Sequence, residues 1–399
     1  MSAPDVIRGV AELLGAPGAF DDERTPAHAL GTGRVGAALT LAVLADGGPD
    51  TGLRRAAHGH LVAAVKSPGA MRPGGLYFGV ASLALAAHTM ARPGEYRSLL
   101  DGLTPGVREA AAVRTAALRA ELAAGAGLDA PTFDAVAGAA GLGRLLLALE
   151  PDGPALADLL AAVVELAVPG DGDRLPRWWT AGGPGTLGDD PEYAGGHFNL
   201  GLAHGIPGPL ALLAAARLHG VRVPGQDEAV AALAEWLAGR RVGHHWPMAL
   251  HVEDEEAGRL PADPPTRAAW CYGTPGVARA LFLAGAALAR ADWQHDAVAA
   301  LAGTLGEPAD WNLEGPGLCH GTGGLLRITQ RMAEDSGSAE LAAHLPGLAA
   351  TVTRELDAAL GADPALGLLE GAPGAALALH ACTAPHPGPP AWDTFLLLG

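Results

Sequence analysis

The sequence is poor in cysteine, in basic side chains and in long apolar runs, and each shortage excludes a class of protein. Three cysteines in 399 residues are too few for a disulfide framework. That points to a reducing compartment and leaves the thiols available for a metal. The 26 lysines and arginines are outnumbered by 43 aspartates and glutamates, which gives a net charge of −17. An acidic chain without a basic cluster is not expected to bind nucleic acid.

The chain also lacks the sequence features of export and of membrane insertion. Its first residues have neither the basic start nor the apolar run of a signal peptide. The longest apolar runs, such as residues 35–45, are too short to span a bilayer. We therefore expect a cytoplasmic protein without membrane insertion.

Glycine, in contrast, is abundant, and many of its 57 copies recur as a Gly-x-x-Gly motif followed by an apolar helical stretch. Seven copies end at residues 36, 82, 141, 208, 276, 324 and 374, with Ser82 in the last place of the second copy. Each interval between copies has room for two helices, and repeated helical hairpins indicate an open solenoid or a closed ring. We predict an all-α fold, an α/α toroid of about seven helical hairpins, as a single domain over residues 1–399.

The position of the glycines suggests which helices face inward. A helix that is apolar on most sides is buried, so the helices that follow the motifs should form the inner layer. A phosphate cradle at a helix N-terminus is the alternative use of such glycines. No copy matches Gly-x-x-x-x-Gly-Lys-Ser/Thr and none follows an expected strand, which argues against a nucleotide site.

Two intervals contain long non-helical segments, residues 169–199 and 241–266. Long structured loops at one end of a ring are candidates for the wall of a substrate site. The alternative is that they only pack over the edge of the ring. Both interpretations are open from the sequence.

Two of the cysteines lie in matching glycine-rich frames. Cys271 stands in a Trp-Cys-Tyr-Gly frame and, 48 residues later, Cys319 stands in a Cys-His-Gly frame beside His320. Two thiolates and one imidazole are soft ligands that suit zinc, and three protein ligands leave the fourth tetrahedral position open, as in catalytic sites. Coincidence is the alternative in a glycine-rich chain, but the shared frame argues against it. Cys382 lies outside both frames and is expected to be a buried apolar filler.

Other polar residues stand out because the motif ends are otherwise small or apolar. They are Asp134, His204, Arg267 and Tyr272. If all motifs lie at one rim, these side chains converge on one pocket. A single histidine in an apolar frame is more often a hydrogen-bonded core residue than a catalyst, so only convergence with a metal site favours catalysis.

Four segments together carry a resemblance to a known family. Residues 133–141, 199–208, 267–273 and 318–321 resemble the lanthipeptide synthetase C (LanC) family, the lanthionine cyclases. The resemblance extends from about residue 28 to residue 380, and the Trp-Cys-Tyr-Gly and Cys-His-Gly frames are its most specific part. The family's fold is an α/α toroid, in agreement with the repeats.

The resemblance implies a role for each of the residues singled out above. It implies one Zn²⁺ per chain with the ligands Cys271, Cys319 and His320. It implies an active site that contains His204, Asp134, Arg267 and Tyr272, with the tyrosine beside the metal.

The activity implied by the resemblance is the formation of (methyl)lanthionine rings in a dehydrated precursor peptide, with a dehydratase as partner. A zinc-activated cysteine thiol adds to dehydroalanine or dehydrobutyrine, and the resulting enolate must be stabilised and protonated. Arg267 could stabilise the oxyanion, and His204 could relay the proton with Asp134 orienting it or balancing charge; the sequence does not decide which of these groups delivers the proton. The chain has no room for a fused dehydratase or kinase domain, so we expect a stand-alone cyclase.

Several other functions compete with this one. A LanC-like enzyme could add a thiol such as glutathione to dehydroamino acids, and a non-catalytic toroid could serve as a zinc-containing peptide-binding scaffold. A prenyltransferase would need basic residues for a diphosphate and an aromatic funnel, but aromatics make up only 5% of the chain. A toroidal glycosidase would need two carboxylates at the site, where only Asp134 is available.

Overall fold

The computed structural model describes residues 1–16, 18, 20, 25–46, 52–168, 175–183, 193–362, 364–384 and 392–399. These residues are mainly helical. The helices are α1 (Ala3–Gly15), α2 (Arg34–Asp46), α3 (Leu53–Val65), α4 (Gly79–Met90), α5 (Arg97–Ala124), α6 (Ala130–Phe133), α7 (Ala139–Leu149), α8 (Pro154–Glu165), α9 (Pro207–Leu218), α10 (Gln226–Ala238), α11 (Val252–Glu256), α12 (Thr274–Leu288), α13 (Ala291–Gly306), α14 (Thr322–Ser336), α15 (Ala339–Leu360) and α16 (Ala372–Thr383). The described residues also form two short strands, β1 (His197–Asn199) and β2 (Ala249–His251), and the 3-10 turns η3 (Pro308–Asp310) and η4 (Thr394–Leu396). Among the described helices, none combines the length and the apolar character needed to cross a membrane.

The described chain divides into two compact units. The first contains Met1–Val107 and Leu313–Phe395, and the second contains Arg108–Asn312 and Leu396–Gly399. Two of the three boundaries fall inside α5 and η4, so both units include part of each of these elements. The single domain expected from the repeats stays a prediction.

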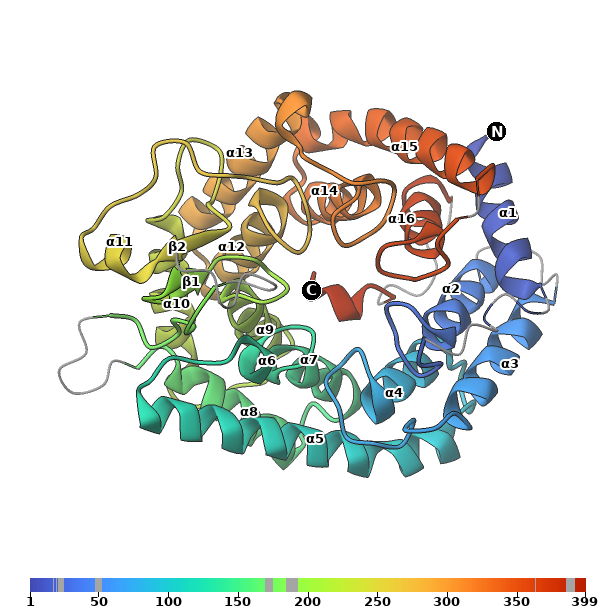
Figure 1. Cartoon of the computed structure of the whole chain (residues 1–399), viewed down its shortest axis with the longest axis horizontal. Coiled ribbons are helices and arrows are strands. Elements are labelled where there is room, and N and C mark those ends of the chain that lie inside the picture. The colour runs from blue at the N-terminus through green and yellow to red at the C-terminus, as the bar shows by residue number, and fades with distance from the viewer. Residues whose placement is uncertain are drawn as a thin grey trace. The chain divides into compact units, whose positions relative to one another are not determined.

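In the first unit, four helices that begin at glycine motifs lie next to one another and are buried on nearly all sides. Helix α14 contacts α16, α16 contacts α2, and α2 contacts α4 (Figure 1). Residues 35–45 of α2 are all buried. Helix α15 instead buries one stripe, which consists of Leu341, Leu348, Val352 and Leu356. The unit therefore has an inner layer of buried helices and an outer layer of amphipathic ones.

The second unit repeats this arrangement with three motif helices. Helix α7 contacts α9, and α9 contacts α12. Helix α8 packs on α7, α10 on α9 and α12, and α13 on α12, so the outer helices follow the inner ones in order (Figure 1). All residues of α9 from Pro207 to Ala216 are buried. As in the first unit, the helix that follows each glycine motif is the buried one, as the sequence predicts.

The last glycine of a motif allows a very close approach of two backbone segments. A Cβ atom at Gly324 would overlap with the carbonyl oxygen of Leu318, and one at Gly276 with that of Trp270, in each case six residues earlier. The same approach is found at Gly36 and Gly374. Because glycine has no Cβ atom, the turn can fold back tightly over the first turn of its helix.

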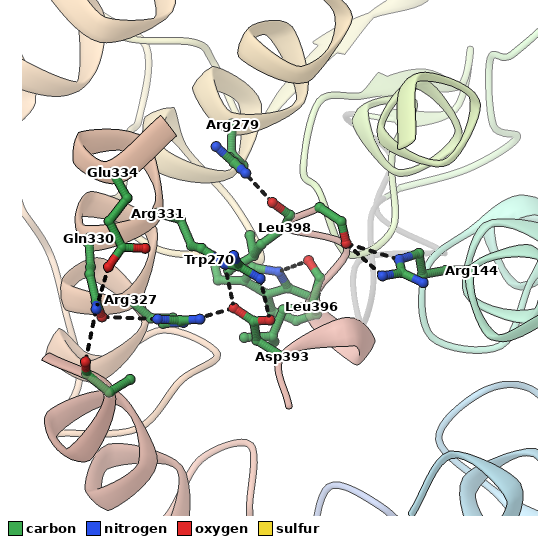
Figure 2. Close-up of polar contacts among 12 residues, drawn as sticks. Arg144, Trp270, Arg279, Arg327, Gln330, Arg331, Glu334, Asp393, Leu396 and Leu398 are labelled. Carbon is green, nitrogen blue, oxygen red and sulfur yellow. Dashed lines mark hydrogen bonds and ion pairs between the residues drawn. The ribbon is translucent and has the colours of Figure 1, made fainter. Parts of the chain in front are cut away.

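A buried carboxylate, Asp393, is held by two arginines in the first unit (Figure 2). Its side chain is 2% exposed and accepts hydrogen bonds from Arg327 Nε at 2.8 Å and from Arg331 Nε and Nη2 at 3.0 Å. Burial alone would raise the pKa of Asp393, but the charges and hydrogen bonds of the two arginines outweigh it and lower the pKa to about 2. The ionised carboxylate thus ties the segment 392–395 to α14.

In the second unit, three side chains hold residues 396–399 by their backbone carbonyl oxygens (Figure 2). The donor and acceptor pairs are Arg144 Nη2 with Gly399 at 2.7 Å, Arg279 Nε with Leu398 at 2.6 Å and Trp270 Nε1 with Leu396 at 2.9 Å. Because Trp270 belongs to the Trp-Cys-Tyr-Gly frame, this segment braces the turn that leads into α12.

Replacing Asp393 with asparagine should destabilise the fold most strongly at neutral pH. The substitution removes the charge that balances the buried Arg327 and the half-buried Arg331, and the loss of one partner of a buried ion pair costs roughly 3–5 kcal/mol. The pKa of Asp393 is lowered from 3.8 to about 2 in the folded state. This lowering of the Asp393 pKa contributes about 2 kcal/mol to the free energy of unfolding. The contribution is fully present above the pKa of Asp393 in the unfolded chain and is lost as the pH falls through its pKa in the folded protein. In chemical denaturation, the difference in midpoint between wild type and Asp393→Asn should therefore shrink from about pH 4 towards about pH 2.

Asp292→Asn is the matched control for this experiment. Asp292 forms an ion pair with Arg290 on the surface, where water and salt weaken the interaction, so its loss should change stability little. Equal destabilisation by the two substitutions, or a difference for Asp393 that persists unchanged in acid, would contradict the assignment.

Candidate active site

Asp134 lies in the turn between α6 and α7, and its side chain is 2% exposed. One of its carboxylate oxygens, Oδ1, accepts hydrogen bonds from the backbone N–H groups of Val136, Ala137 and Gly138 at 3.0, 2.7 and 2.8 Å. The other oxygen, Oδ2, lies 2.7 Å from Nδ1 of His204. The turn therefore fixes the carboxylate through one oxygen and presents the other to the histidine.

This contact determines how His204 can act. Since a carboxylate oxygen accepts the bond, Nδ1 of His204 carries the proton, and Nε2 is the nitrogen that can exchange a proton with a substrate. The ring is accessible, with its side chain 40% exposed. Partial burial lowers the pKa of His204, but the hydrogen bond to Asp134, the charge of Asp134 and the nearby Cys271 thiol outweigh it and raise the pKa. A histidine in this setting is suited to proton transfer near neutral pH.

Tyr272 is half-buried in the turn before α12, and its ring centroid lies 6.3 Å from that of His204. Its hydroxyl oxygen accepts a hydrogen bond from the side-chain amide of Asn199 at 3.1 Å. Asn199 is absent from the residues predicted for the site, although it opens the motif that contains His204. The signal that could have identified it is a polar side chain at the start of an otherwise apolar frame.

Arg267 and Cys271 lie on the same turn as Tyr272. Gly273 has a φ of +100° and packs so closely on the Arg267 carbonyl oxygen that a Cβ atom would overlap with it, so glycine closes this turn. Cys271 is 6% exposed, and its carbonyl oxygen accepts a hydrogen bond from the N–H of Ala203 at 3.3 Å. That bond joins the turn before α12 directly to the turn that carries His204.

Cys319 and His320 lie in the first unit, in the turn before α14. The N–H groups of Leu318 and Cys319 both donate to the carbonyl oxygen of Leu369, at 2.8 and 2.9 Å. The carbonyl oxygen of His320 accepts a hydrogen bond from the N–H of Glu314 at 2.9 Å. Both side chains are half-buried. The backbone bonds thus fix the turn at both residues.

The three residues predicted as zinc ligands, Cys271, Cys319 and His320, form a group that could hold a metal ion. Two thiol sulfurs and one imidazole nitrogen suit Zn²⁺ and leave one of four positions for a further ligand. The chemistry of this donor set fits the metal that the sequence resemblance implies. Cys382, at the end of α16, is half-buried rather than fully buried, and burial raises the pKa of its thiol.

The two long loop segments meet in a small antiparallel ribbon within the second unit. Strand β1 belongs to the first segment, residues 169–199, and pairs with β2 of the second, residues 241–266. The ribbon leads directly into the His204 turn, which it helps to hold. Residues 169–174 and 184–192 lie outside the described residues, and the substrate wall expected from these segments stays a prediction.

Comparison with known proteins places this arrangement in a family. A family model of lanthionine synthetase C-like proteins matches residues 27–397. The chain belongs to the lanthionine synthetase C-like family. Among solved structures, nisin cyclase resembles this LanC-like protein with a TM-score of 0.80 and 20% sequence identity, over 99% of this chain and 96% of that chain. No curated protein matches the sequence. The family and the likeness in fold confirm the predicted fold class, the all-α LanC-like toroid.

In this LanC-like protein, Asp134→Asn should lower the pKa of His204. The amide keeps an oxygen for the three backbone N–H groups, but it removes the negative charge that favours the imidazolium. An NMR pH titration of the histidine ring signals would measure the shift, with the His204 signal assigned from a His204→Ala variant. Asp129→Asn, on an exposed side chain five residues earlier, is the matched control and should leave the titration unchanged. If His204 titrates in both variants as it does in the wild type, the charge of Asp134 does not raise its pKa and the prediction is wrong.

Proposed function

We propose that the protein is a zinc-dependent lanthionine cyclase that closes thioether rings in a dehydrated precursor peptide. Membership of the LanC-like family supports the class of reaction. The observation that carries the proposal within this chain is the Asp134–His204 pair beside the Cys271–Tyr272 turn. A scaffold that only binds peptides would need neither a buried carboxylate nor a histidine held by it in one tautomer.

Cys271, Cys319 and His320 would hold one zinc ion per chain. When bound, zinc would lower the pKa of an incoming cysteine thiol and keep the thiolate nucleophilic. The donor set supports this assignment because three protein ligands leave a position for the substrate sulfur.

The chemical step is an addition without gain or loss of atoms. The cysteine thiol gives up its proton, its sulfur forms a bond to the β-carbon of dehydroalanine or dehydrobutyrine, and the electron pair of the C=C bond moves onto the α-carbon and its carbonyl oxygen; the proton that the α-carbon then receives balances the one that the thiol lost. Arg267 would stabilise the negative charge on that oxygen. His204 would deliver a proton to the α-carbon from Nε2, since its Nδ1 is committed to Asp134. The product is a lanthionine or methyllanthionine ring.

The substrate implies a partner and a place in a reaction sequence. Dehydroalanine and dehydrobutyrine arise from serine and threonine by loss of water, so a dehydratase must act on the precursor first. We infer that the cyclase works with such an enzyme in the cytoplasm. The reducing environment there would keep both the ligand thiols and the substrate thiols available.

The zinc assignment predicts that purified protein contains close to one equivalent of zinc. Cys271→Ala and Cys319→Ala should each lose most of it, because only two protein ligands would remain. Both variants should stay folded, since the chain has an apolar core of its own. Metal analysis and thermal unfolding measure the two properties. Cys382→Ser is the matched control, and the ligand set is wrong if it alone loses zinc or if both alanine variants retain it.

Cyclisation should convert free thiols of a dehydrated precursor into rings without a change in mass. His204→Ala and Arg267→Ala should keep zinc but slow the loss of alkylatable thiol by a factor on the order of 10²–10³, because each removes a group that acts on the enolate. His219→Ala, an exposed histidine at the end of α9, is the control and should cyclise like wild type. Zinc-loaded wild type that does not exceed the uncatalysed rate, or that produces no defined ring pattern, would favour the non-catalytic scaffold.

A further inference from the structure

Asn199 is a buried polar residue that contacts the proposed active site without a role in the chemistry described above. It is the last residue of β1, and it is 3% exposed. Its side-chain nitrogen Nδ2 lies 3.1 Å from the hydroxyl oxygen of Tyr272, and its Oδ1 lies 2.9 Å from the backbone nitrogen of Gly201. One side chain therefore links the turn that carries His204 to the turn that carries Cys271.

The bond to Gly201 determines the direction of the bond to Tyr272. A backbone N–H can only donate, so the atom of the Asn199 amide that faces Gly201 must be the oxygen. The amide nitrogen then faces Tyr272 and donates to the phenol oxygen. A hydroxyl that accepts a hydrogen bond on this side can donate its own proton only on its other sides. The Asn199 amide thus occupies one acceptor position of the Tyr272 oxygen, and the phenol proton lies on another side of that oxygen.

The packing around this bond leaves the tyrosine ring little freedom. A Cβ atom at Gly201 would lie 2.7 and 2.8 Å from two ring carbons of Tyr272, and one at Gly205 would lie 2.7 Å from Oδ1 of Asn199. The backbone of Asn199 is itself fixed, because its carbonyl oxygen accepts a hydrogen bond from the N–H of Ile206 at 3.1 Å. Glycines on both sides therefore allow the asparagine and the ring to be held in one arrangement.

We propose that Asn199 is a positioning residue for cyclisation, which acts through Tyr272 by directing the phenol hydroxyl as a hydrogen-bond donor towards the reacting peptide. This inference rests on the proposed cyclase function. The natural acceptor for such a donor is the carbonyl oxygen that becomes negatively charged when the thiol adds to the dehydroamino acid. Arg267, which we propose to stabilise the same oxygen, lies five residues before Tyr272 in the chain.

A double-mutant cycle distinguishes positioning from a general structural role. Asn199→Ala, Tyr272→Phe and the double variant would be compared with wild type by the rate of thiol loss from a dehydrated precursor peptide under single-turnover conditions. Each single variant should be slower by a factor on the order of 10–10². The double variant should be no slower than Tyr272→Phe alone, because Asn199 has nothing to direct once the hydroxyl is absent.

Two further variants control for loss of structure. Asn199→Asp keeps an oxygen for the N–H of Gly201 but replaces the donor to Tyr272 with an acceptor, so the phenol would donate to the new carboxyl group instead of the substrate. It should be at least as slow as Asn199→Ala while it retains zinc. Tyr77→Phe removes a hydroxyl that donates to the Phe395 carbonyl in the first unit, should not change the rate, and should combine independently with Asn199→Ala.

The outcomes separate this inference from the function on which it rests. Absence of cyclisation by the wild-type protein would sink the cyclase function itself. If wild type cyclises but the Asn199 and Tyr272 effects multiply, Asn199 acts independently of the phenol and the positioning role is wrong. The positioning role is also wrong if Asn199→Ala or Asn199→Asp cyclises the peptide at the wild-type rate. Loss of zinc or of the folded state in both Asn199 variants would show a structural role instead.

Discussion

The close backbone approach at the glycine motifs is the constraint on which the arrangement of the protein depends. At Gly276 and Gly324 the chain folds back so tightly before a helix that a side chain would collide with a carbonyl oxygen. Each such turn leads into a buried helix, and backbone hydrogen bonds at the N-terminal end of that helix hold the residues before the glycine. The residues proposed for the site lie in the segments that precede the buried helices α7, α9, α12 and α14. A helix packing device thus also fixes the position of the chemistry.

Two buried aspartates show how the surroundings of a carboxylate decide its use. The carboxylate of Asp393 forms ion pairs with the guanidinium groups of two arginines, Arg327 and Arg331. These lower its pKa to about 2, and the ion pairs connect two segments of the fold. Asp134 has one oxygen bound to three backbone N–H groups and the other to His204. The backbone bonds keep that carboxylate in place, while its second oxygen raises the pKa of a partly exposed histidine. The same type of side chain, an aspartate, therefore stabilises the fold in one unit and supports the proposed proton transfer in the other.

The features of the protein that could be predicted from the sequence are those with a repeated local pattern. The glycine motifs predicted where the buried helices begin, and the Cys-His-Gly and Trp-Cys-Tyr-Gly frames singled out the candidate ligands. The contacts of Asn199 and Asp393 were not predictable, because each depends on residues distant in the chain: Asn199 meets Tyr272 73 residues later, and Asp393 meets Arg327 66 residues earlier. The periodicity of the local sequence carries no information about contacts between residues so far apart in the chain. The three-residue strands of the ribbon are likewise too short to produce a recognisable alternation.

The central claim is that two cysteines and one histidine hold a zinc ion whose remaining position receives the thiol of the substrate. X-ray absorption at the zinc edge measures both parts of the claim, because sulfur ligands lie at about 2.3 Å and nitrogen or oxygen ligands at about 2.0–2.1 Å. The protein alone should show two sulfur ligands and two lighter ones. Addition of a saturating precursor peptide with free cysteines and no dehydrated residues should raise the sulfur count to three, because its thiol can bind but cannot react. Fewer than two sulfurs without peptide, or a sulfur count that stays at two with this peptide while the dehydrated form is cyclised, would contradict the account.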